Sequence, residues 1–206
     1  MLKTLPKIEP MTLLEHATPF DDPQWLFEVK YDGVRALAYI HGDDCKLQVD
    51  GKEVSDPQFR ELARVLPGDL NAKNAILDGE LVVLDRVGKA QYGDLMAGRG
   101  LVLFAAFDLL WVNGNDLRER PLVERKELLR FRVRHPSDRL MFVDYQEGAG
   151  SALYSRMCER DMEGIVGKPL YSRYVGGSGG TTWIKVKNPS YSKAEGREEL
   201  LVQRLS

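Results

Sequence analysis

Short apolar segments bounded by turn residues are the feature that most constrains what this chain can fold into. Such segments are typical of strands when they are rich in β-branched or aromatic residues. Six segments fit that description: Phe27–Val29, Val34–Ile40, Ile76–Leu84, Leu101–Leu110, Met141–Val143 and Ile165–Val166. Several are separated by turns that contain glycine and aspartate, such as His41–Asp44 and Asp85–Lys89, as in antiparallel hairpins. The sequence therefore predicts a fold rich in antiparallel sheet.

Helix signals are fewer. Residues 55–57, Ser-Asp-Pro, are typical of an N-cap followed by proline at a helix start. One apolar face follows: Phe59, Leu62, Ala63 and Leu66. Pro121 begins a second predicted helix that extends to about Arg132, and Ser151 is expected to cap a third. Strands interleaved irregularly with a few helices predict an α+β fold of mostly antiparallel sheets flanked by helices.

Composition excludes several classes of protein. The longest apolar stretch, Leu101–Val112, is interrupted by Asp108 and is too short to span a bilayer, and the N-terminus lacks the apolar core of a signal peptide. We therefore expect a cytoplasmic location and no membrane contact. The net charge is −2, from 29 basic and 31 acidic residues, which argues against strong, sequence-independent binding of nucleic acid by this chain alone.

Charged residues stand beside glycine in strands that are otherwise apolar. Four segments share this pattern: Glu28–Arg35, Leu77–Glu80, Met162–Lys168 and Trp183–Lys187. Lysines and carboxylates are costly to bury unless they pair or meet a ligand. Gathered at one site, they would suit a polyphosphate with Mg²⁺, and the amine would have the cationic surroundings that favour a nucleophilic lysine. The alternative is a set of ion pairs at strand ends.

These segments carry a resemblance to a known family. Lys30-Tyr-Asp-Gly-Val-Arg35 resembles the KxDGxR signature of covalent nucleotidyl transferases, which include ATP-dependent DNA ligases, RNA ligases and mRNA-capping enzymes. The other motifs follow in the family's order: Leu77–Glu80, Phe104–Leu110, Glu163–Val166 and Trp183–Lys187. The segments that flank them are similar to the ligase module of bacterial ligase D. The resemblance extends from about Met11 to Leu200.

The resemblance implies a fold, a domain arrangement and an activity. It implies the nucleotidyltransferase fold (the ATP-grasp-like fold of ligase adenylation domains) over residues 1–190. DNA ligases of the family follow this domain with an oligonucleotide-binding barrel, but the stretch 191–206 is too short for one, so we expect a tail there and no barrel. The implied reaction begins when Lys30 attacks the α-phosphate of ATP and holds AMP as a phosphoramidate. AMP then passes to a 5′-phosphate end, and the strand is sealed.

The resemblance also assigns the nucleoside contacts. Glu28 would accept a hydrogen bond from the adenine amino group, which favours ATP over GTP because guanine presents a carbonyl there. Phe107 would stack on the adenine, and Glu80 would bind the ribose.

The phosphate contacts are assigned in the same way. Glu163 would lie near the metal, Mg²⁺ or Mn²⁺, while Lys185 and Lys187 would stabilise charge on the phosphates. The two lysines alternate along one predicted strand and therefore share a face. Arg35 would meet the phosphate of the acceptor end.

The sequence departs from the family where nucleic acid should be contacted. Asp50 stands where many ligases have an arginine that binds the 5′-phosphate, and a carboxylate there would repel a phosphate. Pro169 and the run Gly176–Gly180 replace two further basic contacts. We therefore expect the partner to be nucleic acid with a 5′-phosphate end, nicked DNA first, bound weakly. A partner that supplies an oligonucleotide-binding domain is also expected.

Two alternatives remain open. One is a self-adenylating transferase with weak nick sealing whose acceptor is RNA or another molecule. The other is a binding module without catalysis, which has no need for all these charged residues. Lastly, the stretch Arg118–Arg134 alternates basic residues with glutamates, so we expect a solvated helix face there.

Overall fold

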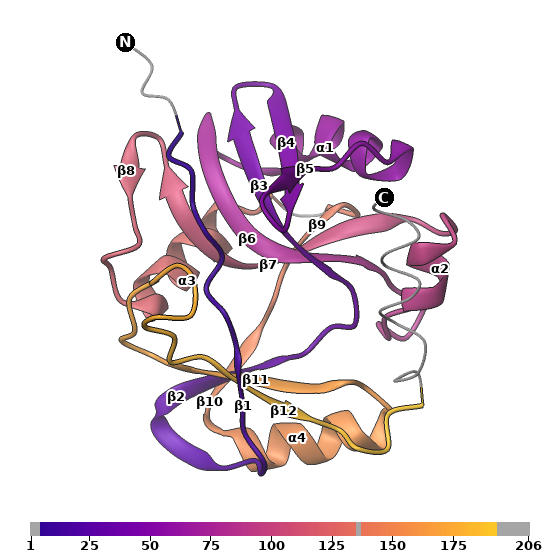
Figure 1. Cartoon of the computed structure of the whole chain (residues 1–206), viewed down its shortest axis with the longest axis vertical. Helices are drawn as coiled ribbons and strands as arrows, with labels where there is room; N and C mark the ends of the chain where they lie inside the picture. The colour runs from indigo at the N-terminus through magenta and orange to yellow at the C-terminus, as the bar shows by residue number, and fades with distance from the viewer. Residues whose placement is uncertain (1–4, 135–136, 193–206) are drawn as a thin grey trace.

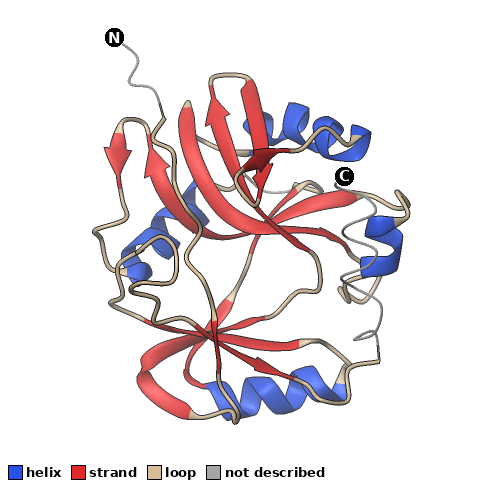
Figure 2. Cartoon of the chain, in the orientation of Figure 1, coloured by secondary structure: helices blue, strands red, loops and turns tan. Residues whose placement is uncertain are grey.

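Two sheets form the frame of the computed structural model, which describes residues 5–134 and 137–192 (Figures 1 and 2). The larger sheet has the strand order β5-β4-β3-β6-β7-β8, with β9 paired to β7, and the smaller has the order β1-β12-β11-β2-β10. Most neighbouring strands are antiparallel. The exceptions are the parallel pairs β1·β12 and β7·β9. The predicted α+β class with mostly antiparallel sheets is therefore confirmed.

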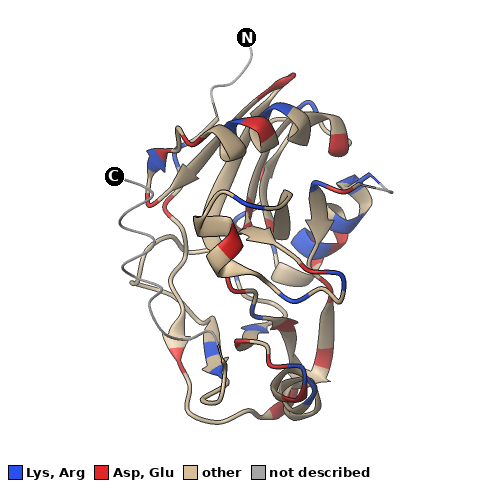
Figure 3. Ribbon diagram, turned by 90° about the vertical axis from the view of Figure 1, so that its right-hand side faces the viewer, with Lys and Arg blue, Asp and Glu red and all other residues tan. Residues whose placement is uncertain are grey.

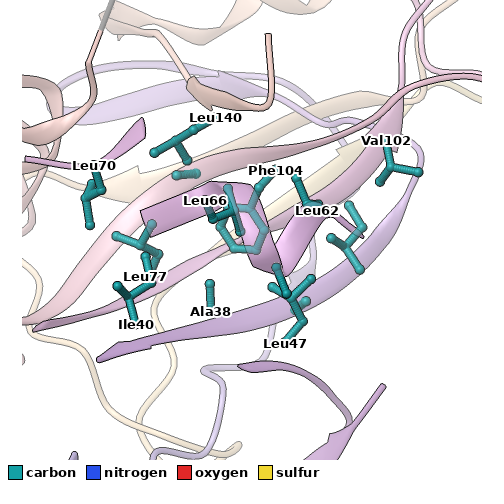
Figure 4. Close-up of a cluster of buried hydrophobic side chains, with 14 of the residues drawn as sticks. Ala38, Ile40, Leu47, Leu62, Leu66, Leu70, Leu77, Val102, Phe104 and Leu140 are labelled. Carbon is teal, nitrogen blue, oxygen red and sulfur yellow. The ribbon is translucent and has the colours of Figure 1, made fainter. Parts of the chain in front are cut away.

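The larger sheet is built from long hairpin strands, and helix α1 packs on it. Its strands are β3 (Val34–His41), β4 (Asp44–Val49), β5 (Lys52–Glu53), β6 (Asn74–Val83), β7 (Val102–Val112), β8 (Asn115–Asp116) and β9 (Leu140–Phe142). Helix α1 (Pro57–Asp69) begins where predicted, because the Asp56 side chain accepts a hydrogen bond from the Gln58 amide at the N-cap. Its predicted apolar face is buried on this sheet, where Leu62 and Leu66 belong to the same cluster as Phe104 and Leu77 (Figure 4).

The smaller sheet is covered by another helix. Its strands are β1 (Leu14–Glu15), β2 (Asp21–Val29), β10 (Tyr145–Ala149), β11 (Gly164–Pro169) and β12 (Ile184–Lys187). Helix α4 (Gly150–Glu159) packs Leu153 and Met157 against Phe27 and Ile165. The prediction that Ser151 caps this helix is wrong. The cap is Ala149, and the Ser151 amide inside the first turn donates to Asp21 instead.

A third apolar cluster joins the two sheets. Leu26 of β2 packs there with Leu37, Ile76 and Leu110 of the larger sheet, and Trp183 belongs to the same cluster. Helix α3 (Leu122–Arg132) lies beside this junction, and the short helix α2 (Tyr92–Met96) follows β6. None of the helices in the described ranges is long and apolar enough to cross a membrane.

The expected solvated face of α3 is only partly present. Glu124, Glu127 and Arg130 are exposed, but Arg125 and Lys126 are fully buried. The prediction of a wholly solvated charged face is therefore wrong. The physical reason is that Asp108 and Glu28 are buried in the sheets, and each needs a cation beside it.

Candidate active site

One cavity between the two sheets gathers most of the predicted site residues. Five of them line it: Glu28, Lys30, Arg35, Glu80 and Phe107. They come from both sheets, because β2 ends at this cavity while β3, β6 and β7 pass it. Glu163 is not among the lining residues, but it accepts a hydrogen bond from Lys30, which is. Lys185 and Lys187 are not among them either; they lie on β12, which pairs with β11.

Lys30 stands immediately after β2, with its amine beside a carboxylate. The Lys30 amide donates to the Gly164 carbonyl at 3.0 Å, and its Nζ donates to Glu163 Oε2 at 2.8 Å. The lysine side chain is 17% exposed and the Glu163 side chain 6%. Gly164 has a φ of +137°, and a Cβ there would lie 2.1 Å from the Val186 carbonyl oxygen. Glycine is thus required beside Glu163 for this close approach of β11 to β12.

The C-terminal part of the described chain contacts the loop that follows Lys30. Asp32 is buried and accepts a hydrogen bond from the Tyr191 hydroxyl at 2.7 Å. Asn188 anchors the same segment by donating to the Met162 carbonyl at 3.0 Å. The sequence predicted a tail that begins at Tyr191, and this contact was not predicted. The rest of the predicted tail, 193–206, lies outside the described residues.

Glu28 is almost completely buried and has two lysine partners. Its Oε1 accepts from Lys126 of α3, and its Oε2 lies 2.5 Å from Lys168 Nζ of β11. Lys168 Nζ also lies 4.3 Å from the centre of the Phe107 ring. Burial lowers the pKa of Lys168 to about 8; nearby Lys126 also lowers it, and Glu28 opposes the shift. Neither lysine was assigned from the sequence.

Arg35 also lies near the Phe107 ring, in a separate network. Its Nε and Nη2 donate to Asp78 at 3.1 and 2.8 Å, and its guanidinium carbon lies 5.5 Å from the centre of the Phe107 ring. The Tyr174 hydroxyl donates to the same carboxylate at 2.7 Å and accepts from the Met11 amide. Asp78 is fully buried, so this network fixes Arg35 to β6.

Lys185 and Lys187 share one face of β12, as their alternation predicts. Both reach Glu15 Oε1 on neighbouring β1, at 3.3 and 2.8 Å. The hydrogen bond from Lys187, followed by that from Lys185, lowers the pKa of Glu15. Two cationic groups therefore stand side by side at this edge of the sheet.

The surroundings of Glu80 in the cavity favour the protonated form of its carboxyl group. Burial raises its pKa to about 7, Lys30 and Arg35 oppose the shift, and Glu163 adds to it. At pH values between the ordinary pKa of 4.5 and the raised pKa of about 7, the folded protein keeps this proton, whereas the unfolded chain has lost it. The stabilising contribution of this proton is lost as the pH rises through that window.

We expect Glu80→Gln to change the unfolding free energy in favour of the variant more at pH 8 than at pH 5. At pH 8 the unmodified protein must bury an ionised carboxylate, whereas glutamine cannot ionise. Urea unfolding of both proteins at the two pH values measures this as a difference in unfolding free energy. Glu127→Gln on the exposed face of α3 controls for the substitution itself. An identical effect of Glu80→Gln at pH 5 and pH 8 would contradict the assignment.

This arrangement is chemically suited to binding a nucleotide and reacting with it. It combines a lysine amine, an accessible aromatic ring and charges of both signs in one cavity. The family profile described as ATP dependent DNA ligase domain matches residues 9–187. The chain therefore belongs to the ATP-dependent DNA ligase domain family.

Individual relatives agree with this membership. The chain is 34% identical over 171 residues to the multifunctional non-homologous end joining protein LigD of Mycolicibacterium smegmatis, covering 80% of this chain and 21% of LigD. It is 27% identical over 194 residues to the SPbeta prophage-derived DNA ligase-like protein LigB of Bacillus subtilis, covering 90% of this chain and 69% of LigB.

A solved structure of mycobacterial DNA ligase D complexed with ATP and MES has the same fold. It superposes with a TM-score of 0.72 at 30% identity, over 87% of this chain and 60% of that one. The predicted ligase adenylation fold is therefore confirmed. This chain spans about a fifth of the length of the LigD proteins it matches.

Proposed function

We propose that this chain is the catalytic domain of an ATP-dependent DNA ligase that works through a covalent AMP on Lys30. The observation that carries the proposal is the Lys30 amine, 2.8 Å from Glu163 at the cavity lined by Glu28, Glu80 and Phe107. The solved mycobacterial relative is described as complexed with ATP, which supports ATP as the nucleotide.

In the proposed first step, the Lys30 amine attacks the α-phosphorus of ATP. A nitrogen–phosphorus bond forms, the bond from the α-phosphorus to the bridging oxygen breaks, and pyrophosphate leaves. The amine is nucleophilic only as the free base, so the ammonium, which donates to Glu163, must first lose a proton to solvent. Lys185 and Lys187 would exchange Glu15 for phosphate oxygens and so stabilise the departing charge.

We propose that Mg²⁺ or Mn²⁺ joins the nucleotide at Glu163. Within residues 5–134 and 137–192, no cluster of three or more His, Cys, Asp or Glu side chains could hold a metal alone. A carboxylate beside a polyphosphate fits a metal that binds largely through phosphate oxygens and water. Its chemistry would be to neutralise phosphate charge.

The proposal is tested by incubating the protein with α-labelled ATP and Mg²⁺ or Mn²⁺. We expect one AMP per chain, stable to base and labile to acid as a phosphoramidate is. No label with either metal would contradict the proposed function.

A second candidate keeps self-adenylation but seals nicks poorly, with RNA or another acceptor or with a partner that supplies a barrel domain. The observation that favours it is Asp50, exposed in the turn between β4 and β5. This turn borders a groove of about 700 Å³ whose wall also includes Arg35 and Lys7. Basic and acidic residues are interspersed along the chain (Figure 3), in line with its net charge of −2.

We expect Asp50→Arg to strengthen binding to nicked DNA with a 5′-phosphate, because it replaces a repulsive charge by a bidentate phosphate partner. The gain should be about tenfold or more at low salt and should shrink as salt rises. Titration of nicks with and without the 5′-phosphate measures it. Equal gains on both nicks, or tight phosphate-dependent binding by the unmodified chain, would contradict the loss of basic contacts.

A further inference from the structure

Lys126 is a fully buried lysine that the proposed first step does not use. Its Nζ donates to Glu28 Oε1, to the Phe107 carbonyl at 3.2 Å and to the Val143 carbonyl at 3.0 Å. A lysine ammonium has three donors, and here each has an acceptor. A single side chain of α3 therefore ties β2 to β7 and to the segment after β9.

The contacts of Lys126 converge on the residues proposed to recognise the base. Glu28 would meet the purine edge and Phe107 its face, and both line the same cavity. Lys126 holds the carboxylate of one and the backbone of the other. Its ammonium is also covered by the rings of Phe142 and Tyr145, at 4.7 and 5.1 Å from the ring centres.

Two lysines leave the Glu28 carboxylate little freedom. Lys126 holds one carboxylate oxygen, and Lys168 lies 2.5 Å from the other. An ionised carboxylate has about four lone-pair positions, so two remain for a ligand. With both oxygens anchored, those remaining positions have fixed directions, which is the condition for discriminating a donor from an acceptor on the ligand.

Burying a lysine between a helix and a sheet costs free energy, because its charge loses contact with water. Apolar residues of similar volume usually stabilise such a contact equally well or better. Lys126 lies at 0% exposure beside aromatic rings, where methionine would fit the same space. Its charge therefore serves Glu28 and the Phe107 backbone rather than the packing of α3.

We propose that Lys126 is a positioning residue for base selection, which holds the Glu28 carboxylate so that the site takes a purine with a 6-amino group. Its bond to the Phe107 carbonyl supports the stacking of any purine and so does not affect this selection. This inference rests on the proposed self-adenylation and adds a residue that determines its nucleotide specificity. Lys126 acts through Glu28 and does not touch the reacting phosphorus.

The test compares the rate of covalent labelling by ATP with that by purine riboside triphosphate, which lacks the 6-amino group. We expect the unmodified protein to prefer ATP. Lys126→Met should lower the rate with ATP far more than the rate with the analogue, so that the preference falls by at least about tenfold. Lys126→Arg, which keeps a cation and several donors, should restore part of the preference.

Arg125→Lys is the matched control. Arg125 is the neighbouring buried cation on α3 and binds Asp108 on β7, next to Phe107, without contacting Glu28. This change should slow labelling by the two nucleotides in equal proportion, because it only loosens α3 on the sheet. If Lys126→Met also slows both equally, Lys126 is merely structural and the proposal is overturned.

A double variant covers the case in which Lys126→Met does not fold. Glu28→Gln/Lys126→Met leaves no unpaired carboxylate, and it should have the same preference for ATP as Glu28→Gln alone. A further loss of preference in the double variant would show that Lys126 acts independently of Glu28, against the proposal. If the unmodified protein takes no label from any nucleotide, the proposed function itself fails and the inference falls with it.

Discussion

Lys30→Ala should abolish covalent labelling by α-labelled ATP while the protein stays folded. The Lys30 amine is the proposed nucleophile, and the methyl group of alanine cannot replace it. Its removal also leaves the nearly buried Glu163 carboxylate without this partner, so the variant should lose some stability as well as the label. Labelling followed by gel separation measures the covalent step, and circular dichroism measures the fold.

A matched control for this variant is Lys46→Ala. Lys46 is also a lysine in an ion pair, with Glu53 at 2.8 Å, but it lies on the exposed part of β4. We expect its labelling to equal that of the unmodified protein. Label that persists in Lys30→Ala would remove Lys30 from the proposed role.

The largest effect on stability is expected at the buried pair between Asp108 and Arg125. Both side chains are 0% exposed, and Asp108 accepts from Arg125 Nε and Nη2 at 2.8 and 2.7 Å. Asp108→Ala leaves a buried guanidinium without its carboxylate, which typically costs about 3–5 kcal/mol of unfolding free energy. Urea unfolding monitored by tryptophan fluorescence measures the loss.

The same helix supplies the control for this prediction. Arg130 of α3 pairs with Asp144 at 2.6 Å, but these side chains are 57% and 84% exposed. Asp144→Ala should therefore cost less than about 1 kcal/mol. Similar losses from Asp108→Ala and Asp144→Ala would contradict the account of the buried pair.

The sequence predicted the parts of the fold and site that depend on local pattern. The apolar face of α1 and the main strands follow from periodicity, and ordered motifs predicted a site that included Lys30 and Glu163, which are far apart in sequence. Strand β4 was missed although Cys45, Leu47 and Val49 alternate with polar residues, the ordinary signal of a half-buried strand.

The parts that could not be predicted depend on which charges the tertiary fold buries. Lys126 stands between exposed glutamates, and local charge alternation cannot distinguish a buried lysine from a solvated one. Tyr191 reaches Asp32 across 159 positions of sequence, and no periodic signal reports such a contact. The only available hint was that Glu28 and Asp108, in apolar strands, would need cations from somewhere.

Peptide mapping by mass spectrometry after incubation with ATP and Mg²⁺ shows whether ATP places AMP on Lys30. We expect one AMP per chain, on the peptide that contains Lys30, with fragment ions that assign the AMP to that side chain. AMP on any other residue, or an unmodified Lys30 peptide under conditions in which the protein consumes ATP, would contradict this expectation.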